Sequence, residues 1–144
     1  MVVRPWIEEL GVGAIGVAPR KNSIVEVNDI VFYPELAPMK GERKTGSNCI
    51  AKLSSNEYLL LFHGVDELFG YYYTYVALIS NGGELLAMTP RPVITPRIHD
   101  YFGARPATLF VCGAQVVEDK LILSAGKDDE VMPVSYTHLT LPTN

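Results

Sequence analysis

The sequence has little charge, few cysteines and no long apolar run, and each of these features excludes a class of function. Charged residues make up 19% of the 144 positions and the formal net charge is −4, which predicts no basic surface for nucleic acid or an anionic membrane. No apolar run approaches the ~20 residues of a membrane-spanning helix. Residues 1–9 lack the apolar core of a signal peptide. We therefore expect a cytoplasmic protein that contacts neither nucleic acid nor membrane.

The two cysteines, Cys49 and Cys112, fit no metal-binding motif. Each lies in an apolar stretch, which favours two buried free thiols, and a disulfide between them stays open. The sequence therefore predicts no metal site, and it offers no other sign of a bound cofactor.

The residues that are abundant favour β-structure. Hydrophobic residues make up 48% of the chain, which is typical of a folded domain, and eight tyrosines and five phenylalanines favour strands. Twelve glycines and ten prolines occur in short clusters, as expected where many strands are joined by turns. A chain of this length forms one domain or part of a larger one.

The pattern of apolar segments predicts antiparallel sheets. Residues 24–27 and 30–33 flank Asn28-Asp29, the composition of a two-residue hairpin. Residues 49–88 read as four consecutive antiparallel strands, and a second set begins at residue 108. Only residues 6–12 have a weak helical pattern. The fold class is therefore all-β, and repeated four-stranded sheets indicate a β-propeller, although a β-sandwich would use the same strands.

One strand ends in residues suited to binding. The apolar run of residues 58–62 leads directly into His63, Gly64 and, two positions later, Asp66. A strand needs a turn residue such as Gly64 at its end, but it does not need an imidazole and a carboxylate there. Because binding sites are often built at the rim of a rigid sheet, this position is a candidate site.

Several segments, in order, resemble glycoside hydrolase family 130, the β-mannoside phosphorylases and mannosidases. Residues 58–66 are similar to the strand LLIYHGVD of that family, and residues 108–114 to its segment VVFPCGA. The remaining matches are residues 20–23, 44–48, 83–94 and 124–129. The resemblance implies a five-bladed propeller, of which this chain would be a C-terminal fragment of about two to three blades. It also implies a β-mannoside oligosaccharide as substrate, with self-association of the intact protein left open.

The resemblance assigns roles to a few residues. His63, Tyr72, Phe110 and Asp129 would bind the sugar, with Asp128 replacing Asp129 if the alignment shifts by one position. Lys44 and His63 would hold inorganic phosphate, the co-substrate of a phosphorylase. Each residue also has a purely structural interpretation: a strand-end histidine, aromatic packing, a solvated basic loop or an acidic turn.

The resemblance implies that the catalytic apparatus is incomplete in this chain. The family's catalytic aspartate lies in the N-terminal half, and nothing here matches it, so we expect the chain alone to be inactive. Asp100 is a candidate for the carboxylate that activates water in an inverting hydrolase. Two departures from the phosphorylase pattern favour hydrolysis: Asn48 begins a segment that replaces a proline-rich run, and Tyr73 stands where an arginine is expected.

The last ten residues break the preceding pattern. Residues 135–144 resemble translated adapter or vector sequence, so we expect a propeller part at residues 1–134 followed by a non-native tail. Two other functional hypotheses remain beside the enzyme. One is a non-catalytic carbohydrate-binding propeller, and the other is a structural β-sheet domain.

Overall fold

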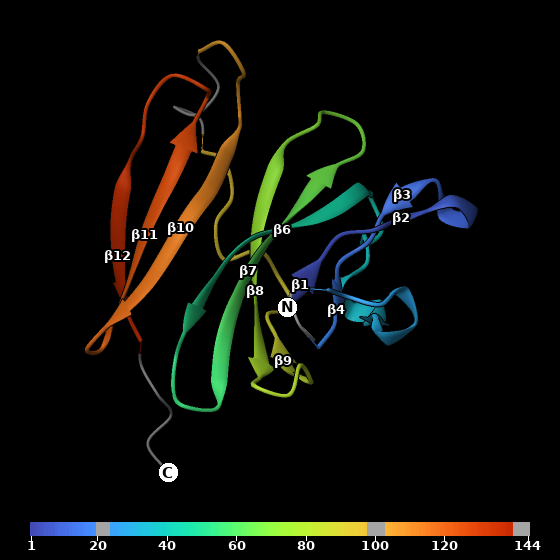
Figure 1. The fold of residues 1–144 in the computed structure, drawn as a ribbon. Coiled ribbons are helices and arrows are strands. Elements are labelled where there is room, and N and C mark those ends of the chain that lie inside the picture. Colours follow the sequence, from blue (N-terminus) through green and yellow to red (C-terminus); the bar gives the residue numbers. More distant parts are fainter. Residues whose placement is uncertain (20–23, 98–102, 140–144) are drawn as a thin grey trace.

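A computed structural model describes residues 1–19, 24–97 and 103–139 (Figure 1). Strands dominate these residues, and their helices are the short 3-10 turns η1 (Glu8–Leu10), η2 (Val27–Asp29) and η3 (Pro34–Leu36). No helix in this part of the chain is long and apolar enough to span a membrane. The strands are β1 (Val2–Val3), β2 (Trp6–Ile7), β3 (Val12–Gly13), β4 (Gly16–Val17), β5 (Val31–Phe32), β6 (Glu42–Lys52), β7 (Glu57–Asp66), β8 (Tyr72–Ser80), β9 (Leu85–Met88), β10 (Leu109–Val117), β11 (Lys120–Lys127) and β12 (Val134–His138).

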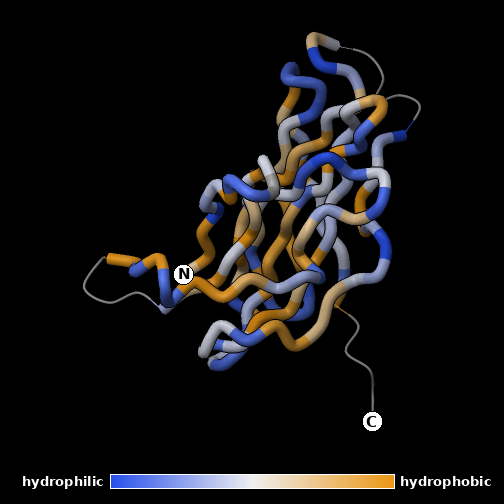
Figure 2. The backbone as a smooth tube through the Cα atoms, turned by 90° about the vertical axis from the view of Figure 1, so that its right-hand side faces the viewer, coloured by the Kyte–Doolittle hydropathy of each residue, from blue (hydrophilic) through white to orange (hydrophobic). Residues whose placement is uncertain are grey.

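The central sheet confirms the four antiparallel strands predicted for residues 49–88. Its order is β6-β7-β8-β9, with each strand paired to the next along the chain. Strand β7 is apolar without alternation because both faces of the sheet are covered. Hydrophilic segments lie mainly at turns, while hydrophobic ones run through the sheets (Figure 2).

Two hydrophobic cores cover the two faces of this sheet. The N-terminal core contains Leu60, Phe62 and Tyr75 from the sheet, together with Ile15 and other residues that precede it. The C-terminal core contains Leu59 and Leu61 from the sheet, packed against residues of β10 and β11. The central sheet thus lies between β1–β5 on one side and β10–β12 on the other (Figure 1). Such face-to-face stacking of sheets is expected of neighbouring propeller blades.

The last sheet has the order β10-β11-β12. The pairing of β10 with β11 is as predicted, and a bulge between Val111 and Gly113 interrupts it. Strand β12 includes the first four residues of the predicted tail. It pairs with β11 along its length, and its five residues are exposed. Its backbone therefore continues the sheet, but its side chains contribute little to the core. The division of the chain at residues 134/135 stays a prediction.

Two local predictions are wrong, the hairpin at Asn28-Asp29 and the burial of Cys112. Asn28-Asp29 forms the 3-10 turn η2, and β5 pairs with β4. A two-residue type I′ hairpin needs positive φ at both turn residues, and neither has it. Residues 6–12, whose helical pattern was only weak, form β2, η1 and β3 and no α-helix. Both cysteines are free, as expected, but Cys112 is exposed because it lies in the bulge of β10.

Candidate functional site

His63 is positioned by two features of the neighbouring strand β6. Gly46 lies opposite His63, and a Cβ atom there would come within 2.7 Å of His63 Cε1, so the imidazole covers a position that only glycine leaves open. A bulge between Ser47 and Cys49 then turns Asn48 toward the ring. Asn48 Oδ1 lies 2.5 Å from His63 Nδ1. Because an amide oxygen only accepts, Nδ1 carries the proton and Nε2 can accept a hydrogen bond.

Three rings from three strands meet at this position. The centroid of the His63 ring lies 5.2 Å from that of Tyr72 and 5.1 Å from that of Phe110. Tyr72 and Phe110 are 6.0 Å apart in an edge-on arrangement. Tyr73 and Tyr75 pack against the opposite, N-terminal core, as the alternation of side chains along a strand requires. The structure thus brings together three of the predicted sugar-binding residues, which we call the aromatic cluster.

The surroundings of His63 keep it neutral near pH 7. Burial of the ring, followed by the positive charges of Lys44 and Arg4, lowers the pKa of His63 to about 4. Arg4 is held in place by a hydrogen bond of 2.9 Å from its Nε to Thr45 O. Lys44, a predicted phosphate ligand, therefore acts on the same group as Arg4, which sequence reasoning missed.

This pKa shift predicts that His63 destabilises the fold in acid. In the unfolded chain His63 takes up a proton near pH 6.5, whereas in the folded chain it does so only near pH 4. Between these two pH values protonation of His63 favours the unfolded state, so stability that is fully present above pH 6.5 is lost as the pH falls toward 4. After allowance for partial exposure, we expect a loss of about 1–2 kcal/mol. Urea unfolding of wild type and His63→Gln at pH 7 and pH 4.5 measures it. The free energy of unfolding should decline less between pH 7 and pH 4.5 in His63→Gln than in the wild type, and an equal decline would contradict the prediction. The control is His138→Gln, because His138 is exposed.

Arg105 joins the aromatic cluster, although nothing in its sequence context indicated this. Its Nη2 donates to Tyr72 Oη at 3.3 Å, and its guanidinium carbon lies 5.4 Å from the centroid of the Tyr72 ring. Asn48 and Arg4 were likewise not predicted as site residues. Their positions depend on a bulge and on contacts between segments far apart in sequence, which no local pattern reveals.

The acidic candidates are distributed differently from the prediction. Asp129 is exposed, whereas Asp128, the alternative, is only 4% exposed, and its Oδ1 has no hydrogen-bond partner among the described residues. Both residues have positive φ, in the turn that follows β11. The role of Asp129 stays a prediction, and Asp100 lies outside the described residues.

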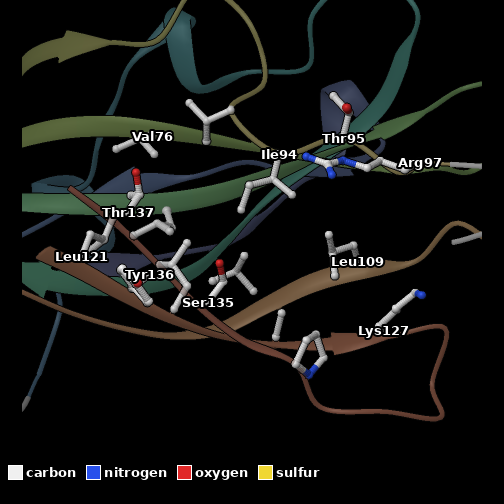
Figure 3. A pocket seen from close by; sticks show the side chains of 16 residues that line it. Val76, Ile94, Thr95, Arg97, Leu109, Leu121, Lys127, Ser135, Tyr136 and Thr137 are labelled. Carbon is white, nitrogen blue, oxygen red and sulfur yellow. The ribbon is translucent and has the colours of Figure 1, made fainter. Parts of the chain in front are cut away.

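A cavity lies apart from the aromatic cluster. It has a volume of about 790 Å³ and lies between β7–β8, residues 93–97 and β10–β12 (Figure 3). Aliphatic side chains such as Ile94, Leu109 and Leu121 dominate its lining, with Arg97 and Lys127 among its polar residues. Among the described residues, its lining includes no carboxylate and no imidazole. The candidate site is therefore the aromatic cluster with its three cations, and no group of residues in the described ranges could hold a metal ion.

Comparison with known proteins identifies the family and the fold of the chain. A family model described as beta-1,4-mannooligosaccharide phosphorylase matches residues 22–141. The beta-1,2-mannobiose phosphorylase of Listeria innocua, solved in complex with beta-1,2-mannobiose, superposes with a TM-score of 0.78 at 24% identity, over 96% of this chain and 40% of its own. A putative glycoside hydrolase of Parabacteroides distasonis gives a TM-score of 0.67 at 21% identity, over 89% of this chain and 42% of its own.

A third solved structure, a glycosyl hydrolase of Bacteroides ovatus, gives a TM-score of 0.63 at 17% identity, over 90% of this chain and 41% of its own. No curated protein matches the chain. The chain thus spans about two fifths of the length of the solved structures that it resembles. The structural agreement confirms the predicted fold class, an all-β part of a propeller.

Proposed function

Because the chain belongs to glycoside hydrolase family 130, we propose that it forms the C-terminal part of an enzyme that cleaves β-mannosides with inversion. A general acid from outside this chain protonates the glycosidic oxygen, while phosphate or water attacks the anomeric carbon from the opposite side. The observation that carries the proposal is the convergence of His63, Tyr72 and Phe110 from three different strands. The chain supplies one wall of the substrate pocket and is inactive by itself.

Each residue of that wall has a chemical task. Tyr72 and Phe110 offer aromatic faces on which the C–H face of a mannose ring can stack. Neutral His63 accepts a hydrogen bond from a sugar hydroxyl through Nε2, with Asn48 fixing its tautomer. Lys44 provides a positive charge beside them. The substrate class that fits this arrangement is a β-mannoside oligosaccharide, and the carboxylate of Asp129 remains the proposed ligand of further hydroxyls.

The test uses the chain joined to the N-terminal part that its gene supplies upstream. We expect this protein to release product from β-1,2- or β-1,4-mannobiose, and the 144-residue chain alone to release none. His63→Ala should lower kcat/KM about 10- to 100-fold through loss of a buried hydrogen bond at the sugar.

The matched control is His138→Ala, because His138 is exposed on β12 and its Nδ1 contacts the surface residue Asp119. It should leave kcat/KM unchanged. If the joined protein binds mannobiose without cleaving it, the chain belongs to a carbohydrate-binding propeller instead. If it neither binds nor cleaves mannobiose, the proposed function is wrong.

A further inference from the structure

Strands β6 and β10 belong to different sheets and lie against each other. At one point of contact, the His63 ring covers Gly46 of β6 and meets the ring of Phe110 of β10. Further along, a shallow hollow is lined by residues 50–54, at the end of β6, and by residues 114–116 of β10. Residue numbers thus rise in the same direction along both strands, so β6 and β10 are parallel neighbours.

Each of these two strands carries one of the two cysteines, between the two points of contact. Cys49 of β6 pairs with Leu61 of β7, and both side chains pack in the C-terminal core. Directly opposite residues of a sheet point to the same face, so the Cys49 thiol points toward the sheet that contains Cys112. The two thiols therefore lie at about the same height on facing strands.

The acidity of Cys49 supports this placement. Burial of the thiol, followed by the negative charge of the Cys112 thiolate, raises the pKa of Cys49 to about 11. One unit charge acts appreciably on another only over a short distance when salt water lies nearby. The electrostatic effect and the strand geometry thus agree that Cys49 and Cys112 are neighbours.

Cys112 has the access and the freedom that a redox-active cysteine needs. Its side chain is exposed, and it lies in the bulge of β10, where no residue of β11 pairs with it. Its Sγ donates to Phe110 O at 3.3 Å, a weak hydrogen bond that is easily exchanged. Cys112 can therefore meet a reagent from solution and then approach the half-buried Cys49.

We propose that Cys49 and Cys112 are a redox modification site, at which a small-molecule disulfide such as oxidised glutathione joins them in a reversible disulfide bond. The Cys112 thiolate attacks one sulfur of the reagent, which releases one glutathione thiol and leaves a mixed disulfide. Cys49 Sγ then displaces the second glutathione thiol. Both protein thiols are oxidised, the reagent is reduced, and the two protons pass to the two glutathione thiolates. This modification goes beyond the proposed function.

The disulfide would lie directly beside the aromatic cluster. Cys49 follows Asn48, whose amide oxygen holds the His63 ring, and Cys112 lies two residues after Phe110. Closing the bond fixes β6 against β10 at this point, and with them the contact between the rings of His63 and Phe110. The redox state of the two thiols would thus act on the candidate site through the strands that carry it.

The first measurement is the equilibrium between dithiol and disulfide in glutathione buffers, for the 144-residue chain in native buffer and in urea. We expect tryptic peptides that join Cys49 to Cys112, which dithiothreitol separates. The equilibrium constant should be at least about 10-fold larger in native buffer, because only the fold holds the thiols together. The same comparison on the chain joined to its upstream part does not depend on the isolated chain folding. Equal constants in native buffer and in urea for that joined protein would overturn the proposal.

Two variants separate the roles of the thiols. Cys49→Ala should keep glutathione on Cys112 as a stable mixed disulfide, because no second thiol displaces it. In Cys112→Ala, the half-buried Cys49 should react with oxidised glutathione at least about 10-fold more slowly, because little of it is thiolate near pH 7. Far-UV circular dichroism checks that both variants fold. A wild-type protein that accumulates the glutathione adduct of Cys112 as fully as Cys49→Ala does would show that the thiols cannot meet, and would overturn the proposal.

Discussion

Replacing Phe62 with alanine is expected to lower the free energy of unfolding by about 3–5 kcal/mol, a large part of the stability of an ordinary domain. Phe62 is 1% exposed and lies at the centre of the N-terminal core. Its ring stacks on Tyr75 with centroids 5.3 Å apart and planes inclined by 20°. Alanine would leave a cavity between β7 and the preceding strands, which the paired backbone cannot close. Urea unfolding followed by far-UV circular dichroism measures the loss.

Phe69→Ala is the matched control, because it makes the same chemical change at a side chain that is 65% exposed. Phe69 stacks on Tyr71 in the exposed turn between β7 and β8, so we expect a loss of less than about 1 kcal/mol. Similar losses for the two variants would mean that the N-terminal core does not stabilise the chain. The central sheet would then be held mainly by the C-terminal core on its other face.

The central sheet was predictable from the sequence because its signals are local. Residues 58–62 are apolar without alternation, which is typical of a strand covered on both faces, and turn residues separate each strand from the next. Tyr72 and Tyr73 lie on opposite faces of this sheet, as the two-residue period of a strand requires. Here the local preferences and the final packing agree.

The parts that failed depend on distant contacts. The hairpin at Asn28-Asp29 had a suitable composition, but β5 pairs instead with β4. Arg105 lies in a proline-containing segment without periodicity, and only the docking of that segment on Asp128 and β8 brings it to Tyr72. Asn48 reaches His63 because of a bulge, and no spacing rule locates a bulge in a single sequence.

Replacing Gly64 with alanine is expected to lower the free energy of unfolding by about 2–4 kcal/mol, the second large effect. A Cβ atom at this position would lie 2.0 Å from Glu42 Oε1 and 2.4 Å from its Cδ. The carboxylate is not free to move aside, because it accepts hydrogen bonds from Tyr75 Oη at 2.7 Å and from Met39 N–H at 3.0 Å. Expelling it would leave the buried Tyr75 hydroxyl without that partner. The same urea experiment applies.

Two further variants separate this clash from the general effect of adding a methyl group to a strand. Gly126→Ala in β11 is the matched control, because a Cβ atom there meets nothing within 4 Å and the loss should stay below about 1 kcal/mol. In a Glu42→Ala background the obstacle is gone, so Gly64→Ala should cost much less than it does in the wild type. If Gly64→Ala lowers the free energy of unfolding equally in both backgrounds, Gly64 is required for its backbone conformation and not for the space that it leaves to the Glu42 side chain. The effects of the two substitutions would then be additive. In that case, the hydrogen bond between Glu42 and Tyr75 would not explain why a glycine follows His63.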